Sequence, residues 1–218
     1  MLLHNSLGIC VGASTVSSVN LLPSSNTQAA LSTEIIQHHG NPKLIVEKIF
    51  QNGIPEKVVV TGRKFRRLLN VPSISEPEAI ELAFEYLKLD ADLIVSAGRE
   101  NFIAYQLDNI RKITKSITGN KCASGTGEFF LQQIRRMNLD VEDAIQLGCD
   151  GEPYNISGRC SVFCKSDCTH ALNKGVPKKD VVAGLSRMMA QKIIELISKT
   201  HVDRIILIGG VSRNESII

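Results

Sequence analysis

Two cysteines of this chain lie in segments whose residue types could support metal chemistry. They are Cys122, in the run NKCASGTGE over residues 120–128, and Cys160, in the run SGRCSVF over residues 157–163. Each is predicted to open a helix, where unpaired N–H groups and the positive end of the helix dipole favour a thiolate and an anionic cluster bound to it. An iron–sulfur cubane normally takes four thiolates. Two cysteines in one chain therefore predict that a second copy completes the set.

The first half of the chain has a strand, a glycine-rich turn and a second strand. The turn lies within residues 8–15, and the apolar stretch 16–22 follows it. A further strand is predicted over residues 57–61, and a helix is predicted over residues 76–87. Other predicted elements are an extended segment around 32–36 and a helix that starts at Asn41-Pro42, carries Leu44, Ile45, Ile49 and Phe50 on one apolar face, and ends at Asn52-Gly53. We expect a domain boundary near Asp90.

The second half repeats this pattern. A predicted strand over residues 92–97 leads through a small-residue turn into a second strand over 101–107. The remaining predicted elements are a strand over 111–117, helices over 126–137, from near 157 and over 179–199, and a last strand over 204–208. The long helix should bury Val182, Leu185, Met189, Ile193, Ile194 and Ile197. The pattern predicts an α/β fold with two related subdomains, residues 1–90 and 91–218, around a nucleotide cleft.

Composition excludes several classes of protein. The 218 residues are 43% hydrophobic and 22% charged, which is typical of a soluble globular protein. The net charge of +3 is spread along the chain and aromatic residues make up 5%, so we expect no nucleic-acid partner. No apolar run is long enough to cross a membrane, and no signal peptide is evident, so we expect a cytoplasmic protein with reduced thiols.

Four segments, taken in order, resemble one known family. They are residues 8–15, 119–130, 158–170 and 207–214. These segments are similar to the ATP-dependent activators of 2-hydroxyacyl-CoA dehydratases and to related benzoyl-CoA reductase subunits. That family belongs to the superfamily of acetate and sugar kinases, chaperones and actin. The resemblance implies an actin-like, ribonuclease H-like ATPase fold. Because related domains continue for several more elements, it also implies that the domain is truncated at the C-terminus.

The resemblance implies a nucleotide site. The first turn would hold the phosphates of ATP through backbone N–H groups and small hydroxyls, because only glycine and short side chains let the main chain approach closely. The second turn would face it from the other subdomain, and Gly209-Gly210 would lie under the adenosine. The implied nucleotide-binding residues are Gly12, Ser14, Thr15, Gly98, Gly125, Thr126, Gly127, Gly209, Gly210 and Asn214.

The resemblance also implies a cluster and a reaction. Cys122 and Cys160 correspond to ligands of one 4Fe-4S cluster shared by a homodimer. ATP binding and hydrolysis, with Mg²⁺, would drive a low-potential electron to a 2-hydroxyacyl-CoA dehydratase or a reductase-like iron–sulfur partner. Ferredoxin or flavodoxin would supply the electron.

Departures from the family pattern leave alternatives open. Cys10 stands where relatives have an aspartate that helps to hold magnesium, and thiols suit this hard cation poorly. The second turn has Val95 and Ser96 where an aspartate is usual, so Glu100 is the nearest candidate for the catalytic carboxylate. Either catalysis has moved to Glu100, or the domain binds nucleotide without efficient turnover. A small-molecule kinase and a non-catalytic module of a larger protein are the alternative functions.

Other residues with metal-binding chemistry are interpreted structurally. Cys164 and Cys168 follow Cys160 at helical spacing and could add ligands, but packing against the core is the favoured interpretation. Cys149 is assigned to a loop or to the core. The pair His38-His39 is assigned to a helix end or to the surface, because no partner lies at a zinc-binding spacing.

Overall fold

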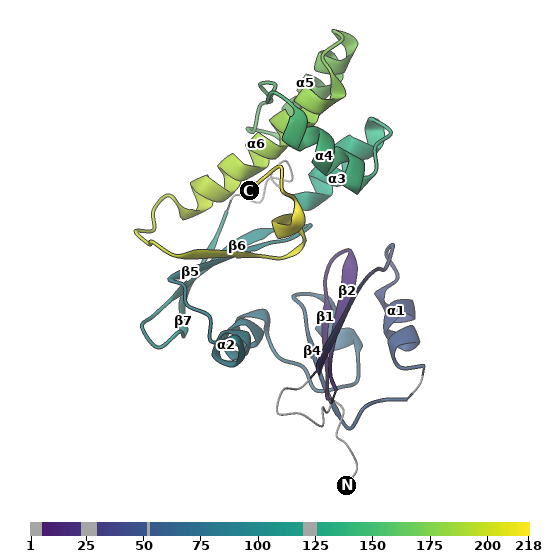
Figure 1. Cartoon of the computed structure of the whole chain (residues 1–218), viewed down its shortest axis with the longest axis vertical. Helices are drawn as coiled ribbons and strands as arrows, with labels where there is room; N and C mark the ends of the chain where they lie inside the picture. The colour runs from purple at the N-terminus through teal and green to yellow at the C-terminus, as the bar shows by residue number, and fades with distance from the viewer. Residues whose placement is uncertain (1–5, 23–29, 52, 120–125) are drawn as a thin grey trace. The chain divides into compact units, whose positions relative to one another are not determined.

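The computed structural model describes residues 6–22, 30–51, 53–119 and 126–218 (Figure 1). The chain divides into two compact units, residues 1–88 and residues 89–218. Each unit has its own sheet, its own helices and its own hydrophobic core.

The first unit is built on a four-stranded mixed sheet. Strands β1 (Ser6–Val11), β2 (Thr15–Leu22) and β3 (Ala30–Gln37) form an antiparallel meander, and β4 (Lys57–Thr61) pairs in parallel with β1. The sheet order is β3-β2-β1-β4. Alternation of buried and exposed residues along β1 directs one face of the sheet into the core. That core is formed by Leu7, Ile9, Val11, Val16, Val46 and Val60.

Helices of the first unit begin at clear capping signals. In α1 (Pro42–Ile49), the side chain of Asn41 accepts a hydrogen bond from the Leu44 N–H, and proline occupies the first turn. In α2 (Glu76–Leu87), Ser75 and Glu78 form a reciprocal capping box. A short 3-10 helix, η1 (Phe65–Leu68), lies between β4 and α2. The predicted bounds of α2 are confirmed. The predicted apolar face of α1 is wrong at Leu44, which is 59% exposed, because Val46 provides the buried contact instead.

The second unit repeats the topology of the first. Strands β5 (Leu93–Ala97), β6 (Phe102–Leu107) and β7 (Ile113–Thr118) form a meander, and β8 (Ile205–Ile208) pairs in parallel with β5, so that the order is β7-β6-β5-β8. Every residue of β5 is buried. Two mixed sheets with one strand order, joined to helices, confirm the predicted α/β fold class.

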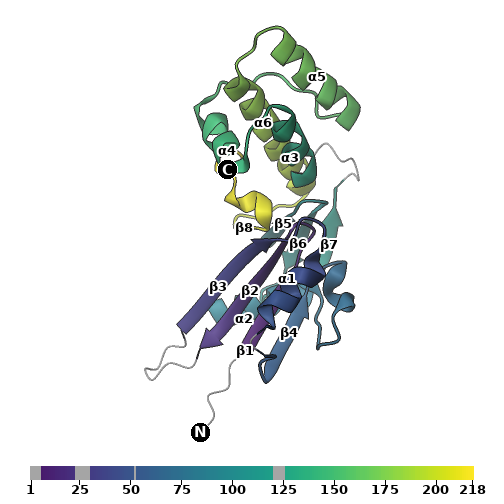
Figure 2. The ribbon, with the colours of Figure 1, turned by 90° about the vertical axis from the view of Figure 1, so that its right-hand side faces the viewer.

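Four helices complete the second unit. They are α3 (Gly127–Arg136), α4 (Val141–Asp150), α5 (Ser161–Asn173) and α6 (Lys178–Ile197), with the 3-10 turn η3 (Gly210–Arg213) after β8. They gather on one side of the sheet of this unit, and α6 packs against β6 and α4 (Figure 2). The predicted buried stripe of α6 is wrong at Ile194, which is 60% exposed.

Helix α4 was not predicted from the sequence. The Asp140 side chain accepts a hydrogen bond from the Asp143 N–H at 2.8 Å and caps the helix, while Ala144 and Gly148 face the core. The assignment of Cys149 to a loop or to the core is therefore wrong, because Cys149 is helical and exposed.

Among the residues that the structure describes, no helix combines the length and the apolar character needed to span a bilayer.

Candidate nucleotide and cluster sites

The first hairpin turn, residues 12–14, is narrow and closed by backbone contacts. The Gly12 N–H donates to the Thr15 carbonyl oxygen at 2.9 Å. A side-chain carbon at Gly12 would lie 3.1 Å from that oxygen, so the turn favours glycine. Ser14 and Thr15 are half-buried beside it. The predicted phosphate-binding residues Gly12, Ser14 and Thr15 thus share one tight turn.

His38 holds this turn from the end of β3. Its ring Nδ1 accepts a hydrogen bond from the Gly40 N–H at 3.1 Å, which leaves the ring proton on Nε2, 3.2 Å from the Gly12 carbonyl oxygen. The His38 N–H also donates to the Ser14 carbonyl oxygen at 3.0 Å. His38 is only 5% exposed, so its assignment to the surface is wrong. The sequence could not reveal this role, because Gly12 lies 26 positions away.

Cys10 lies near a carboxylate that the sequence analysis did not select. The Cys10 side chain is partly exposed. Burial by the surrounding protein raises the pKa of the Cys10 thiol, and the negative charge of Glu76 raises this pKa further. The positive charge of Arg63 lowers it. Arg63 Nε pairs with Glu76 Oε2 at 3.0 Å. In the parallel register Cys10 stands beside Thr61, whose buried hydroxyl oxygen has no hydrogen-bond partner among the described residues.

A neutral, soft thiol does not fit the role of a magnesium ligand. Glu76, in the first turn of α2, does carry the hard oxygen atoms that this cation prefers. Glu76 is therefore a candidate for the carboxylate that the first turn lacks, whereas Glu100 was predicted for the second turn.

The second hairpin turn joins β5 to β6 and contacts the start of α3. The Gly98 N–H donates to the Asn101 carbonyl oxygen at 3.1 Å, and the Gly98 carbonyl oxygen accepts from the Gly127 N–H at 3.3 Å. Thr126, predicted to lie at a helix start, is the N-cap of α3 and accepts a hydrogen bond from the Phe129 N–H. Glu100 is exposed within the turn.

Gly209 brings the end of β8 against the end of β5. Its φ of 94° lies in the left-handed region, and a side-chain carbon there would come within 2.5 Å of the Ala97 carbonyl oxygen. A side-chain carbon at Gly127 would in turn lie 3.3 Å from Val211 Cγ2. The structure therefore gathers three predicted site residues of the second unit, Gly98, Gly127 and Gly209.

Two further predicted residues, Gly210 and Asn214, lie in and after η3. Gly210 begins η3, and an added side-chain carbon there would meet nothing within 4 Å. Asn214 is buried, and its Oδ1 accepts from the Ser216 N–H at 3.1 Å and from the Ser216 hydroxyl at 2.7 Å. This oxygen thus stabilises the turn at the end of the second unit.

Cys160 is the N-cap residue of α5. Its carbonyl oxygen accepts the first helical hydrogen bond from the Cys164 N–H at 2.9 Å, and its half-buried side chain makes no capping hydrogen bond. The loop before it is held by the Ser157 N–H, which donates to Asp167 at 2.9 Å. Cys122 and Gly125 lie outside the described residues, and α3 begins only at Gly127.

Cys164 and Cys168 are buried in the core of the second unit. A hydrogen bond with the Cys164 side chain lowers the pKa of Cys168, more than burial raises it. Within the described ranges, no three histidine, cysteine or acidic side chains are grouped so that they could hold a metal ion. The burial of Cys164 and Cys168 among apolar side chains is what their interpretation as packing residues predicts.

The chain belongs to the BadF/BadG/BcrA/BcrD ATPase family, whose model matches residues 79–218. It is 27% identical over 186 residues to the 2-hydroxyisocaproyl-CoA dehydratase activator of Clostridioides difficile, covering 81% of this chain and 70% of the relative. It is 23% identical to the (R)-2-hydroxyglutaryl-CoA dehydratase activating ATPase of Acidaminococcus fermentans, covering 95% of this chain and 83% of the relative.

A solved structure supports the fold assignment. The activator of 2-hydroxyisocaproyl-CoA dehydratase from Clostridium difficile, with bound ADPNP, superposes with a TM-score of 0.84 at 24% identity. The match covers 98% of this chain and 83% of that structure. The resemblance predicted from the four sequence segments is confirmed by these comparisons.

Proposed function

We propose that this chain is an ATP-dependent iron–sulfur activator that passes a low-potential electron to a 2-hydroxyacyl-CoA dehydratase or a benzoyl-CoA reductase-like partner. Membership of the ATPase family and similarity to two dehydratase activators support this function. Ferredoxin or flavodoxin is the proposed electron donor.

The observation that carries the proposal is the setting of Cys160. As the N-cap of α5 it stands beside the first N–H groups of the helix, to which its own side chain makes no capping hydrogen bond, and this end of a helix favours a thiolate and an anionic cluster. The next two large side chains, Val162 and Phe163, are 69% and 63% exposed. Exposed apolar residues beside a ligand are what we expect where a second protein surface covers the site.

The cysteine chemistry fits a cluster shared by two copies. Cys160 supplies one thiolate, and we propose that Cys122 supplies the second, so that a homodimer provides the four ligands of one 4Fe-4S cluster. When bound, the cluster would accept and release one electron. The residues of the chain would hold it at the start of α5, beside N–H groups that stabilise its negative charge.

We propose that each hairpin turn binds nucleotide phosphate through its backbone. In the first unit, Gly12, Ser14 and Thr15 provide N–H and hydroxyl groups, and His38 keeps the turn in shape. In the second unit, Gly98 lies in the phosphate-binding turn, with Thr126 and Gly127 at the adjoining start of α3, while Gly209, Gly210 and Asn214 form the adenosine-binding segment. Gly125 would join the phosphate- or cluster-binding residues.

Mg²⁺ would accompany the nucleotide, with Glu100 or Glu76 as the carboxylate that contacts it or the attacking water. The thiol at position 10 favours a second candidate function, in which the protein binds nucleotide without efficient hydrolysis. Comparing hydrolysis by the wild type, Glu76→Gln and Glu100→Gln separates the two. A lower rate of ATP hydrolysis in one of the two variants identifies the carboxylate that assists hydrolysis. If the wild type does not hydrolyse ATP, the non-catalytic function is supported.

Anaerobic reconstitution with iron and sulfide tests the cluster. We expect a brown dimer with about four irons, and loss of the colour in Cys122→Ala and in Cys160→Ala. Cys149→Ala is the matched control, because Cys149 is exposed in α4 and should not affect iron binding. A colourless wild type, or full iron content in Cys160→Ala, would refute the proposed function.

A further inference from the structure

Helix α5 carries two thiols that contact each other inside the second unit. Cys164 and Cys168 stand at positions i and i+4, so their side chains lie on the same face of the helix. A side-chain hydrogen bond joins the two thiol groups. Both side chains belong to the core of this unit, where close packing holds them in place. The two sulfur atoms are therefore kept side by side.

A small cavity gives access to one member of this pair. Its volume is about 140 Å³, and residues of α3 and α5, among them Gln133, Arg136, Cys168 and Asn173, line it. Because Arg136 and Asn173 are exposed and also line the cavity, it opens to solvent. Cys164 is 0% exposed and is not among the lining residues. A molecule little larger than water therefore reaches Cys168 and not Cys164.

The polar groups of the cavity suit a small molecule that forms hydrogen bonds. Gln133 is 3% exposed, and its side-chain amide has no hydrogen-bond partner among the residues that the structure describes. The Arg136 Nη2 donates to the Thr169 hydroxyl at 3.2 Å, next to Cys168 in the chain. A buried amide without a partner favours a polar guest, because such a group is costly to leave unpaired.

The surroundings also favour the thiolate form of Cys168. The hydrogen bond with Cys164 lowers the pKa of Cys168, and the positive charge of Arg136 adds to the lowering. Burial and the negative charge of Asp167 raise this pKa, but they do not outweigh the lowering. The thiolate is the nucleophilic form of cysteine. Cys168 is therefore the thiol expected to react first, and Cys164 is the neighbour that can react next.

We propose that Cys164 and Cys168 form a reversible redox pair that is oxidised by hydrogen peroxide through Cys168. The Cys168 thiolate attacks one peroxide oxygen, the O–O bond breaks, and the other oxygen leaves as water after it takes up a proton. Cys168 is then a sulfenic acid. The Cys164 sulfur attacks the sulfenic sulfur, so that an S–S bond forms, the S–O bond breaks, and a second water leaves. Two thiols lose two electrons and two protons, and the peroxide gains them.

This inference does not depend on the proposed function, because it uses neither nucleotide nor cluster. It assigns a modification site to two buried residues that otherwise serve only in packing. The ligand of the site is a small hydroperoxide, and the reaction is confined to a pair that the fold brings together.

The helix should make this disulfide easy to reduce. Residues at i and i+4 have Cα atoms about 6 Å apart, which lies within the range that disulfides span. Their Cβ atoms are about 5–6 Å apart, whereas a disulfide needs about 4 Å. Helix α5 must therefore loosen locally when the bond forms. Strained disulfides have less negative reduction potentials, so a thiol reductant should restore both thiols.

Peroxide treatment followed by disulfide mapping tests the pair, and Cys160 provides a matched control. Cys160 and Cys164 have the same spacing in the sequence as Cys164 and Cys168. The reduced full chain, before any iron is added, would be treated with hydrogen peroxide near neutral pH. The remaining thiols would then be blocked with N-ethylmaleimide, and the disulfides would be identified by tandem mass spectrometry.

The folded chain should favour one of these two disulfides. We expect the Cys164–Cys168 disulfide to exceed the Cys160–Cys164 disulfide by about tenfold or more, because thiolate character and access control the rate. In urea, where only the spacing remains, the two yields should agree within about twofold. Equal yields in the folded chain would overturn the inference. It would also be overturned if both buried thiols stayed reduced after the exposed Cys149 had been oxidised.

Single variants test the order of the two steps. In Cys164→Ser the sulfenic acid of Cys168 should persist and react with dimedone, since the second thiol is missing. In Cys168→Ser the oxidation of Cys164 should slow by about tenfold or more, because the exposed side of the pair is lost. Circular dichroism checks that each variant is folded, and the comparison in the wild type decides if one is not. Faster oxidation of Cys164 than of Cys168 would contradict the assigned roles.

Discussion

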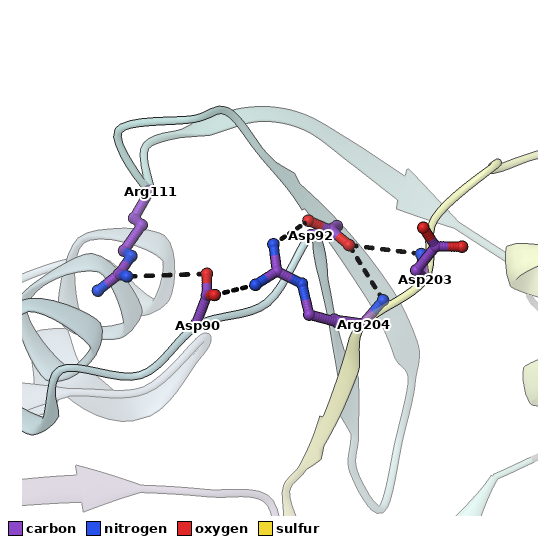
Figure 3. Close-up of polar contacts among 5 residues, drawn as sticks. All are labelled: Asp90, Asp92, Arg111, Asp203 and Arg204. Carbon is purple, nitrogen blue, oxygen red and sulfur yellow. Dashed lines mark hydrogen bonds and ion pairs between the residues drawn. The ribbon is translucent and has the colours of Figure 1, made fainter.

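Arg204 and Asp92 join the starts of the parallel strands β5 and β8 in the second unit, although they are 112 positions apart (Figure 3). Arg204 Nη2 pairs with Asp92 Oδ1 at 2.8 Å, and the Arg204 N–H donates to Asp92 Oδ2 at 3.0 Å. Asp90 pairs with Arg204 and, at 3.7 Å, with Arg111. This network stabilises the pairing of β5 with β8, the strands that end at Ala97 and Ile208 beside Gly98 and Gly209.

Removal of the arginine should therefore weaken the second unit. We expect Arg204→Ala to lower the free energy of unfolding by about 1 kcal/mol, because the pair is partly exposed to water. Chemical denaturation followed by circular dichroism measures the change. Lys43→Ala is the control, since its pair with Glu47 is a more exposed i,i+4 contact expected to contribute only about 0.3 kcal/mol. Equal losses in both variants would argue against a special role for Arg204.

The His38 ring should be needed for the first turn to bind phosphate. His38→Ala removes the partner of the Gly12 carbonyl oxygen and of the Gly40 N–H, and a lost buried hydrogen bond costs about 1–3 kcal/mol. We expect a lower thermal midpoint and weaker ADPNP binding, measured by scanning and titration calorimetry. The exposed neighbour provides the control His39→Asn, because asparagine tolerates the positive φ of 46° at that position. Unchanged nucleotide affinity in His38→Ala would exclude a role for the ring in the turn.

The reactivity of Cys10 should depend on the charges around it. Because Glu76 raises the pKa of the Cys10 thiol and Arg63 lowers it, Glu76→Gln should speed alkylation near neutral pH, and Arg63→Gln should slow it. The expected changes are severalfold and are measured by mass spectrometry after timed treatment with iodoacetamide. Cys149, exposed in the other unit, serves as an internal reference whose rate should not change. If the alkylation rate of Cys10 is the same in the wild type and in both variants, Glu76 is too distant from Cys10 to replace the missing aspartate.

Local signals in the sequence predicted most of the elements. Helix α2 was predicted within its observed bounds, and the structure shows that Ser75 and Glu78 cap its start. Thr126, the first residue of the next predicted helix, is the N-cap of α3. Helix α4 carries a similar signal in Asp140, which caps its start, although no helix was predicted there. Exposed apolar residues such as Leu44 and Ile194 could not be assigned to a face, because neighbouring apolar positions also fitted the helical period.

The candidate site was predictable only where a motif lies in one continuous segment. The glycine turns and Cys160 were found in this way. His38 and Glu76 were missed because their partners, Gly12 and Cys10, come close only after β1 pairs with β2 and β4. The contact of Arg99 with Glu128 likewise depends on how α3 packs against the second turn. Such contacts cannot be predicted from the spacing of residues in the sequence, because they form only when distant segments pack together.

The ion pair of Glu128 should make the stability of the second unit depend on acidity. The hydrogen bond from Arg99 lowers the pKa of Glu128 below its ordinary value of 4.5, against a smaller opposing effect of burial, and Gln132 and Arg135 add to the lowering. A carboxyl group with a lowered pKa stabilises the folded state above its unfolded pKa, and this stabilisation is lost as the pH falls through the folded value. Glu128→Gln should therefore melt a few degrees below the wild type at neutral pH, and the difference should close in acid. Thermal melts recorded from neutral pH down to about pH 3 measure this, and a gap that stays constant across the range would mean that Glu128 contributes through shape rather than charge.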